Sequence, residues 1–462
     1  MIQIHFETLG CKVNQIESES AARSFSDSGF LTDCKNYSAA EKLHSETILC
    51  IVNTCTVTAK AEQKARRVIR LMLDLCPNAC VLVTGCYAEV AKEEIALIDK
   101  RVSVLRGQKK DFLQILAQKF SLYLKDAQNI PGDLPESVKA VNNFLHDYEE
   151  KDSIPFLLST DTFLNHSRSS IKIQDGCNNS CAFCRIHIAR GKSISLEAEE
   201  VLRRVENLEN AGHAETVLTG INLSQYSGTI GGKKAGLTEL LQYLLDNTKK
   251  IAFRLSSLYP QSITEDFCRL IASPRIRPHF HLSVQSGSDR ILKLMARPYT
   301  KNDILNAVNA LRKVKPDAFF ACDIIAGFAG ESEEDFNQTV DLMEECNFTF
   351  IPAFPFSPRP GTAGYTMKPK IPQYIAGKRV QILNQIALNH KNLYVESMRG
   401  KIFEAIIENR KNSVTRAVTE NFLHVQITNA DKMQESDRAN PVRLKILGKS
   451  SNSQCDADAL FL

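Results

Sequence analysis

Three cysteines in one short stretch have the spacing of a metal-binding loop. The stretch GCNNSCAFC contains Cys177, Cys181 and Cys184. Three thiolates on one loop can ligate three irons of a cubic four-iron cluster and leave the fourth iron open to a small ligand. The alternative is a structural zinc site, which would need a fourth ligand such as His187. Soft thiolate donors, the unequal spacing and the position directly after a strand-like run favour iron.

Three further cysteines each follow a strand-like apolar run nearer the N-terminus. TLGC ends at Cys11, VNTC at Cys55 and VTGC at Cys86. In open α/β sheets, ligands bind at the edge where the carboxyl ends of the strands lie. Thiols far apart in the sequence can therefore meet at one site. The alternative, a buried thiol that acts as a small hydrophobic residue, fits Cys50 inside the run ILCIV better than these positions.

The elements that position the N-terminal cysteines form an alternating pattern over residues 1–115. Apolar runs and helical periodicity alternate there, which predicts an open α/β domain of the Rossmann or flavodoxin type. Residues 116–168 lose this periodicity and contain the turn-rich pieces IPGDLPES and HDYEEKDSIPF, so they are interpreted as a linker or insertion. The expected strands are 2–8, 46–53, 79–84 and 102–105, and the expected helices are 15–28, 59–76 and 91–99.

Residues 169–394 resume the alternation, with six strand-like runs separated by helical patterns. Such a series predicts a partial parallel (β/α)6 barrel, whose active site lies where the strands end. Residues 395–462 change to short alternating strands with no long helix, which predicts a small antiparallel β-barrel. The six runs are SIKIQDG, ETVLTGIN, FRLSSLY, HFHLSVQSG, AFFACDIIAGF and FTFIPAFPF.

Composition limits the class of protein. The chain has 462 residues, 43% of them hydrophobic and 24% charged, as in ordinary globular proteins. Its fourteen cysteines are too sparse for a disulfide scaffold, and no signal peptide or membrane-length apolar run is present, so a cytoplasmic protein with reduced thiols is expected. The net charge of +4 means that any polyanion would be bound by a local patch.

The cysteine loop of residues 177–184 resembles that of the radical S-adenosylmethionine superfamily. That superfamily has three cysteines at this spacing and an aromatic residue before the last, here Phe183. The resemblance implies that the open iron binds the methionine moiety and that one electron from the cluster releases a 5′-deoxyadenosyl radical. It also implies that Phe183 packs against the adenine, whereas from the residue alone Phe183 could simply anchor the loop.

The resemblance narrows when the N-terminal motifs are added. LGCKVNQ, NTCTVT and VTGCYAE ahead of a radical loop resemble the methylthiotransferase family over essentially the whole chain. The resemblance implies that Cys11, Cys55 and Cys86 hold a second four-iron cluster, which carries the sulfur to be inserted. The chain departs from the family pattern at Ala329, where proline is common, and at Phe356, where tyrosine is common. The cysteines that match nothing are assigned to core or surface: Cys34, Cys50, Cys76, Cys80, Cys268, Cys322, Cys346 and Cys455.

Two features suggest RNA as the partner. The C-terminal segment VTENFLHVQI resembles the TRAM domain, an RNA-binding module of tRNA-modifying enzymes. The helix expected after Cys55 has a run of basic residues opposed only by Glu62, although such a run by itself is more often a solvated helix face. The basic residues are Lys60, Lys64, Arg66, Arg67 and Arg70.

Together these features predict a tRNA methylthiotransferase with two [4Fe–4S] clusters and S-adenosylmethionine as radical source and methyl donor. The expected reaction is sulfur insertion and methylation at C2 of N6-threonylcarbamoyladenosine at position 37. The alternatives are N6-isopentenyladenosine of tRNA, an aspartate of a ribosomal protein, and a zinc-containing RNA-binding protein without catalysis. Expected partners are the tRNA anticodon stem-loop, a sulfide or persulfide donor, and a low-potential electron donor such as a flavodoxin or ferredoxin.

The resemblance also names the domains and further contacts. Residues 1–115 are expected to form the methylthiotransferase N-terminal domain, 169–394 the radical S-adenosylmethionine core, and 395–462 a TRAM-like domain. The barrel strands end in polar residues and glycines suited to a binding site. Expected contacts to S-adenosylmethionine on this rim are Gly220, Asn222, Gln285 and Asp323.

Overall fold

The computed structural model describes residues 2–126, 134–149, 156–159, 168–411, 414–434 and 440–462. Within it the chain divides into two compact units. The first contains residues 1–165, 175–179 and 184–193, and the second contains residues 166–174, 180–183 and 194–462. No helix among the described residues is both long and apolar enough to cross a membrane.

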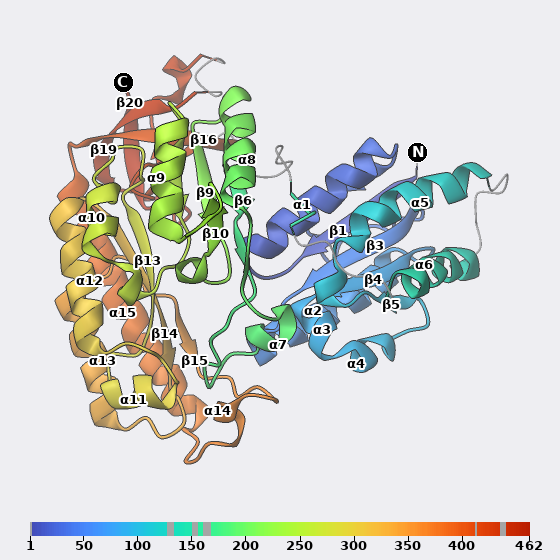
Figure 1. Ribbon diagram of the computed structural model, residues 1–462, viewed down its shortest axis with the longest axis horizontal. Helices are drawn as coiled ribbons and strands as arrows, with labels where there is room; N and C mark the ends of the chain where they lie inside the picture. The colour runs from blue at the N-terminus through green and yellow to red at the C-terminus, as the bar shows by residue number, and fades with distance from the viewer. Residues whose placement is uncertain (1, 127–133, 150–155, 160–167, 412–413, 435–439) are drawn as a thin grey trace. The chain divides into compact units, whose positions relative to one another are not determined.

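The first unit is built on a five-stranded parallel sheet in the order β2-β1-β3-β4-β5 (Figure 1). β3 and β4 are buried along their whole length, as expected for central strands of a sheet covered on both faces. The strands are β1 (Gln3–Thr8), β2 (Leu31–Asp33), β3 (Thr47–Thr54), β4 (Cys80–Gly85) and β5 (Val102–Val104). Four of these strands were expected from the sequence, and β2 was not.

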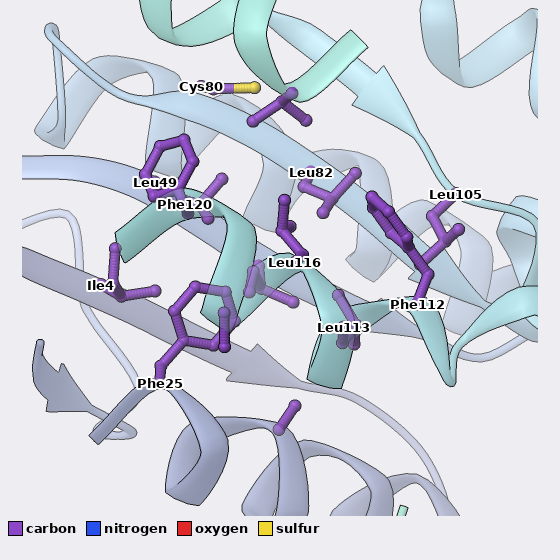
Figure 2. Close-up of a cluster of buried hydrophobic side chains, with 14 of the residues drawn as sticks. Ile4, Phe25, Leu49, Cys80, Leu82, Leu105, Phe112, Leu113, Leu116 and Phe120 are labelled. Carbon is purple, nitrogen blue, oxygen red and sulfur yellow. The ribbon is translucent and has the colours of Figure 1, made fainter. Parts of the chain in front are cut away.

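Helices cover both faces of this sheet. Apolar residues of α1, α5 and α6 pack on one face, where Phe25, Phe112 and Phe120 surround Leu49 and Leu82 (Figure 2). Apolar residues of α2, α3 and α4 pack on the other face. The helices are α1 (Lys12–Asp27), α2 (Ala59–Leu75), α3 (Cys86–Val90), α4 (Lys92–Ala96), α5 (Phe112–Asp126), α6 (Leu134–Glu149) and α7 (Ile186–Arg190).

The interpretation of residues 116–168 as a linker without periodicity is wrong for the described part. Residues up to Asp126 continue α5, and α6 follows at Leu134. Val141 and Leu145 of α6 are buried in the core under the sheet, and the Tyr148 hydroxyl donates to Asp111 Oδ2 at 2.5 Å. The apolar residues of α6 have helical spacing, but flanking turn-rich segments hide this pattern in the sequence.

The second unit contains six parallel strands in two three-stranded sheets, β12-β9-β6 and β13-β14-β15. A parallel bridge between Leu258 and Leu282 connects the two sheets, which confirms the predicted partial barrel. The strands are β6 (Ser169–Lys172), β9 (Glu215–Thr219), β12 (Ala252–Leu255), β13 (His279–Gln285), β14 (Phe319–Ala326) and β15 (Ala353–Pro355). Short pairs join β7 (Gln174–Asp175) to β8 (Ile194–Ser195) and β10 (Gly228–Ile230) to β11 (Lys233–Ala235).

Helices of the second unit follow the strands, as the alternating pattern predicted. Several begin with side-chain caps; Ser332, for example, accepts a hydrogen bond from the Asp335 backbone N–H in a capping box. The long helix α15, which leads into the C-terminal barrel, was not predicted. The helices are α8 (Ala198–Asn210), α9 (Leu237–Asn247), α10 (Glu265–Ile271), α11 (Asp289–Leu294), α12 (Lys301–Val314), α13 (Glu333–Cys346), α14 (Ala363–Thr366) and α15 (Gln373–Met398).

The C-terminal strands close into a small barrel in the order β16-β17-β18-β20-β19, which confirms the predicted β-barrel. Its strand pairs are antiparallel as predicted, except that β18 and β20 are parallel. In β19, buried and exposed residues alternate strictly. Phe319 of β14 and Met398 of α15 belong to the same apolar cluster as the barrel interior. The strands are β16 (Ile402–Lys411), β17 (Val414–Thr419), β18 (His424–Ile427), β19 (Val442–Lys449) and β20 (Ala457–Phe461).

A buried ion-pair network adds to this apolar contact within the second unit. Glu215 at the start of β9 accepts from Arg254 Nε at 2.7 Å and from Arg277 Nε at 2.9 Å. Arg254 also donates to the backbone oxygen of Thr419 in the C-terminal barrel, and Arg277 pairs with Glu420 there. Burial alone would raise the pKa of Glu215, but the nearby arginines lower it to about 2.

Candidate functional site

The three N-terminal cysteines follow three adjacent parallel strands. Cys55 comes directly after β3, Cys86 directly after β4, and Cys11 three residues after β1. Because β1, β3 and β4 are neighbours in the sheet, their carboxyl ends bring the thiols to the same edge. Cys55 and Cys86 are buried, whereas Cys11 is exposed. The geometry therefore gathers three free thiols, one of them accessible to solvent, at the edge that the sequence predicted.

Close backbone packing keeps these thiols together. Gly10 has a φ of +105°, and a Cβ placed there would lie 2.8 Å from Cys55 Cβ and 3.1 Å from Cys55 Sγ. The loop that carries Cys11 thus lies against Cys55 with no room for a side chain. Burial, followed by the nearby Cys86 and Cys11, raises the pKa of Cys55 to about 11.

Two asparagines tie the cysteine loops to each other. Asn14 Nδ2 donates to Leu9 O at 2.8 Å and to Thr54 O at 3.1 Å, which links the segment before Cys11 to the end of β3. Asn53 Nδ2 donates to Asn14 O and to Ser18 Oγ, both at 3.1 Å. Both asparagines lie in the motifs LGCKVNQ and VNTC, but nothing in the local pattern indicated these roles.

Arg190, at the end of α7, is the central cation of the same site. Its Nε donates to Cys86 Sγ at 3.3 Å and its Nη2 donates to Asn14 Oδ1 at 2.6 Å. Its Nη1 pairs with Asp175 at 2.8 Å and with Glu17 at 3.1 Å. Burial alone would lower the pKa of Arg190, but these carboxylates and the neighbouring thiols raise it well above its ordinary value, so the guanidinium stays charged.

The loop with the second cysteine set is shaped by backbone contacts. The Cys177 N–H donates to Gly191 O at 3.1 Å, and the Ser193 N–H donates to Asn178 Oδ1 at 2.9 Å. Gly176 has a φ of +68°, and a Cβ there would lie 2.0 Å from Lys192 O. Cys184 Sγ accepts from the Ile186 N–H at 3.4 Å. These contacts hold Cys177 and Cys184 on a loop that closes back on the segment 191–193.

Cys181 belongs to the second unit and is buried there. Arg297 Nη1 donates to Cys181 Sγ at 3.2 Å and to the Tyr259 hydroxyl at 2.7 Å. Arg297 Nε donates to the Tyr299 hydroxyl at 2.6 Å. The neighbouring Ala182 N–H donates to Met295 O at 3.0 Å, so the loop is anchored next to this arginine. Burial alone would lower the pKa of Arg297, but Tyr299, Tyr259 and Cys181 raise it.

Four predicted contacts to S-adenosylmethionine lie at or near strand ends of the barrel. Gly220 follows β9, and a Cβ there would lie 2.8 Å from Gln174 Oε1. The buried Asn222 caps a turn by accepting from the Ser224 N–H. Gln285 ends β13 with a φ of +73°, a backbone conformation that is uncommon for residues other than glycine. Asp323 on β14 pairs with His281 Nε2 at 2.9 Å.

Phe183 is half-buried and packs against the apolar cluster that contains Ile291, Met295, Phe328 and Phe356. This packing agrees with an anchoring role for the ring. Its contact with adenine stays a prediction. The departures from the family pattern, Ala329 and Phe356, lie in this same apolar cluster, which also contains Ala182 of the cysteine loop.

Cys76 and Cys80, in the segment CPNAC, are close in the sequence but are not assigned as a ligand pair. Cys80 begins β4, so it lies at the opposite end of the strand from Cys86. Cys76 and Cys80 are fully buried and belong to the apolar cores on opposite faces of the sheet. Cys50 is also fully buried, in the same core as Cys76. These thiols therefore act as small hydrophobic residues.

The side chains fit iron–sulfur clusters better than a single metal ion. All fourteen cysteines are free thiols, and each of the two sets supplies soft sulfur donors. Among the described residues, no three His, Cys, Asp or Glu side chains are grouped so that they could hold a single metal ion. The thiolate ligands of a four-iron cluster lie farther apart than those of a single ion, because each thiolate binds a different iron.

The helix that follows Cys55 is basic on its exposed surface. Arg66 donates to the Tyr87 hydroxyl at 2.7 Å and to Glu94 at 3.1 Å, so it is occupied within the first unit. The remaining cations of α2 are exposed and available to a polyanion. They are Lys60, Lys64, Arg67 and Arg70.

Comparison with known proteins places this arrangement in a family. Residues 171–343 match the radical SAM superfamily, and residues 3–107 match the Uncharacterized protein family UPF0004. The chain is 43% identical to the threonylcarbamoyladenosine tRNA methylthiotransferase MtaB of Treponema pallidum, over 92% of this chain and 95% of that protein. The chain belongs to the radical SAM tRNA methylthiotransferase family. The family predicted from the cysteine motifs is thereby confirmed.

Other relatives of this methylthiotransferase chain include proteins of the same name and of a different name. MtaB of Aquifex aeolicus is 32% identical, over 92% of this chain and 96% of its own. The tRNA-2-methylthio-N(6)-dimethylallyladenosine synthase of Bartonella quintana is 30% identical, over 88% and 86%. The solved radical S-adenosylmethionine methyltransferase TsrM of Kitasatospora setae shares the fold, with a TM-score of 0.50 and 16% identity over 79% of this chain and 77% of its own.

Proposed function

We propose that this chain inserts sulfur at C2 of N6-threonylcarbamoyladenosine at position 37 of tRNA and methylates that sulfur. The observation that carries the proposal is the gathering of three free thiols after β1, β3 and β4, in addition to a separate loop with three cysteines. The name of the 43% identical relative supports the choice of nucleoside, because this chain covers 95% of that protein.

The cofactors are two [4Fe–4S] clusters and S-adenosylmethionine. We assign Cys177, Cys181 and Cys184 to the radical-generating cluster, and we assign the three thiols at the sheet edge to the sulfur-carrying cluster. When bound, these groups supply the radical, the sulfur and the methyl group that an unactivated aromatic C–H bond requires. The protein's own residues hold the thiols in place, donate hydrogen bonds to them and exclude water from the barrel rim.

The proposal keeps the domain division inferred from the sequence. In this proposal residues 1–115 form the methylthiotransferase N-terminal domain, residues 169–394 the radical core, and residues 395–462 the TRAM-like domain. The four expected contacts to S-adenosylmethionine on the rim remain part of the proposal. The departures at positions 329 and 356 leave the proposed reaction unchanged.

The substrate side of the proposal rests on surface cations. The four exposed basic residues of α2 offer contacts to phosphates of an anticodon stem-loop, and the closed C-terminal barrel offers a second RNA surface. The reaction also needs a sulfide or persulfide donor and a low-potential electron donor such as a flavodoxin or ferredoxin. We place the protein in the cytoplasm, where tRNA and these donors are found.

Nucleoside analysis tests the substrate. A strain that lacks this gene and any paralogue is complemented with the wild-type chain or with Cys86→Ala, and its tRNA nucleosides are identified by mass spectrometry. We expect 2-methylthio-N6-threonylcarbamoyladenosine only with the wild-type chain. Appearance of 2-methylthio-N6-isopentenyladenosine instead would favour the activity named for the Bartonella relatives. If complementation with the chain produces neither nucleoside, the result would favour modification of a ribosomal-protein aspartate instead.

A further inference from the structure

Each cysteine set receives an N–H from a buried arginine. Arg190 Nε donates to Cys86 Sγ at 3.3 Å, and Arg297 Nη1 donates to Cys181 Sγ at 3.2 Å. The Arg190 side chain is 4% exposed, and Arg297 is 9% exposed. Burial of a guanidinium is costly unless its charge is paired and its N–H groups are hydrogen-bonded. The two contacts lie in different units of the chain.

The surroundings of the two cations differ in charge. Arg190 is matched by the carboxylates of Glu17 and Asp175, and Lys110 also pairs with Glu17. Arg297 bonds the Tyr259 and Tyr299 hydroxyls and donates to Ser283 O at 3.2 Å. Within the part of the chain that the structure describes, Arg297 has no carboxylate partner. The guanidinium therefore faces the sulfur of Cys181 with no carboxylate of the described residues beside it.

Two tyrosine rings fix the orientation of Arg297. Its guanidinium carbon lies 4.2 Å from the centroid of the Tyr259 ring and 4.9 Å from that of the Tyr299 ring. These rings attract the cation and leave it few other orientations. Arg190 is held differently, because its fork bonds a thiol, an amide oxygen and two carboxylates at once.

We propose that Arg297 and Arg190 are positioning residues, and that each raises the reduction potential of the cluster whose cysteine ligand it contacts. This inference rests on the proposed function, because it takes the two cysteine sets as cluster ligands. Uptake of one electron from the external reductant makes a cluster more negative, so a nearby cation and hydrogen bonds to its sulfurs stabilise the reduced form. Removal of the cation must then shift the midpoint potential to a more negative value.

A lysine can restore the charge of either arginine but not its fork of hydrogen bonds. At Arg297 the fork also bonds the Tyr259 and Tyr299 hydroxyls and Ser283 O, so Arg297→Lys should recover only the part of the potential shift that comes from charge. At Arg190 the fork also connects Cys86 to Asn14 on α1 and to Asp175, and a single ammonium cannot make these bonds together. Arg190→Lys should therefore recover the charge effect only in part.

The experiment isolates each cluster in the full-length protein. One parent has the substitutions Cys11→Ala, Cys55→Ala and Cys86→Ala and retains the radical loop. The other has Cys177→Ala, Cys181→Ala and Cys184→Ala and retains the thiols at the sheet edge. Each parent is reconstituted anaerobically with iron and sulfide, its iron content is measured, and its midpoint potential is determined by a redox titration followed by electron paramagnetic resonance.

Each parent then receives Arg297→Gln or Arg190→Gln. We expect Arg297→Gln to lower the potential of the parent that retains the radical loop, and Arg190→Gln to lower the potential most in the parent that retains the thiols at the sheet edge. Arg290→Gln removes an exposed arginine that pairs with Asp335 on the same unit as Arg297, and it should shift neither potential. Thermal unfolding of the metal-free variants reports any loss of fold separately.

The outcomes separate this inference from the proposed function. If a parent binds no iron, the ligand assignment is wrong, and the inference falls with it. If both parents bind about four irons per chain but neither Gln variant moves the potential of its own cluster, the inference is wrong and the ligand assignment stands. Equal shifts in both parents would also overturn it. Should a Gln variant fail to fold, the matching Lys variant must still move the potential in the direction given above.

Discussion

A single added methyl group at Gly10 tests whether the sheet edge builds a cluster site. Gly10 precedes Cys11 with a φ of +105°, and an added Cβ would lie 2.8 Å from Cys55 Cβ. Real Cβ atoms do not approach other atoms this closely, so the loop or the cysteine must move. The substitution Gly10→Ala therefore changes the separation of two proposed ligands without removing either thiol.

The magnitude follows from two separate costs. Alanine in a backbone conformation with positive φ loses about 1–2 kcal/mol relative to glycine. Forced overlap in a packed site adds about 1–3 kcal/mol. Gly29 is a matched control, because its φ is +93° and no atom lies within 4 Å of an added Cβ. Gly29→Ala should thus show only the backbone cost, and the excess of about 1–3 kcal/mol in Gly10→Ala measures the contact with Cys55.

Two measurements check this prediction. The free energy of unfolding of the metal-free protein is compared for Gly10→Ala and Gly29→Ala. Iron content after anaerobic reconstitution should then fall from about eight to about four per chain in Gly10→Ala and remain about eight in Gly29→Ala. If the two variants were equally stable and bound equal amounts of iron, the loop of Cys11 would not be part of a shared ligand site with Cys55.

Three further predictions test other parts of the structure. Cys86→Ala should halve the iron content but keep S-adenosylmethionine cleavage. Cys80→Ala should preserve both the iron content and the cleavage, because Cys80 lies in the apolar core. Equal loss of iron in both variants would overturn the ligand assignment. The double substitution Arg67→Gln/Arg70→Gln should weaken tRNA binding and lower the slope of log affinity against log salt by about 2, as filter binding at several salt concentrations will show. Glu215→Gln should cost about 3–5 kcal/mol at neutral pH, because it leaves the buried Arg254 without its carboxylate and removes one of the carboxylates around the buried Arg277. The pKa of Glu215 is lowered on folding, so its stabilisation of the fold is present above pH 4.5 and is lost as the pH falls toward about 2. Denaturant unfolding across this range should show the free energy of unfolding of the wild type approaching that of the variant.

Much of the site could be predicted because its cysteines follow strongly apolar strands. The runs that form β3 and β4 are buried throughout, and such strands are recognised in sequence with little ambiguity. Once parallel strands are adjacent, their carboxyl ends coincide, so Cys55 and Cys86 had to lie at one edge. Cys80 was set aside in the sequence because it matches no family motif, and the structure places it at the opposite end of β4 from Cys86.

The polar residues that hold the thiols could not be predicted in this way. Arg190 and Arg297 lie 104 and 116 positions from the cysteines that they contact. No local periodicity encodes such a contact, because it depends on how loops from different strands meet. Asn14 was inside a recognised motif, yet its two backbone contacts connect segments that only the folded sheet brings together.

The environment of each thiol accounts for the division of the fourteen cysteines. A thiol in the middle or at the start of a strand, such as Cys50 or Cys80, is enclosed by apolar side chains. Its sulfur is therefore not accessible to a metal. A thiol just beyond the end of a strand meets loop backbone, glycines without side chains and polar groups that can balance its charge. Cys86 meets the cation of Arg190 in this position, and Cys181 meets that of Arg297 in the barrel loop. A neighbouring cation lowers the cost of a buried thiolate, because an unpaired buried charge is costly. Such arginine contacts mark two of the six proposed ligands, Cys86 and Cys181, and the spacing of the cysteines carries the assignment of the other four.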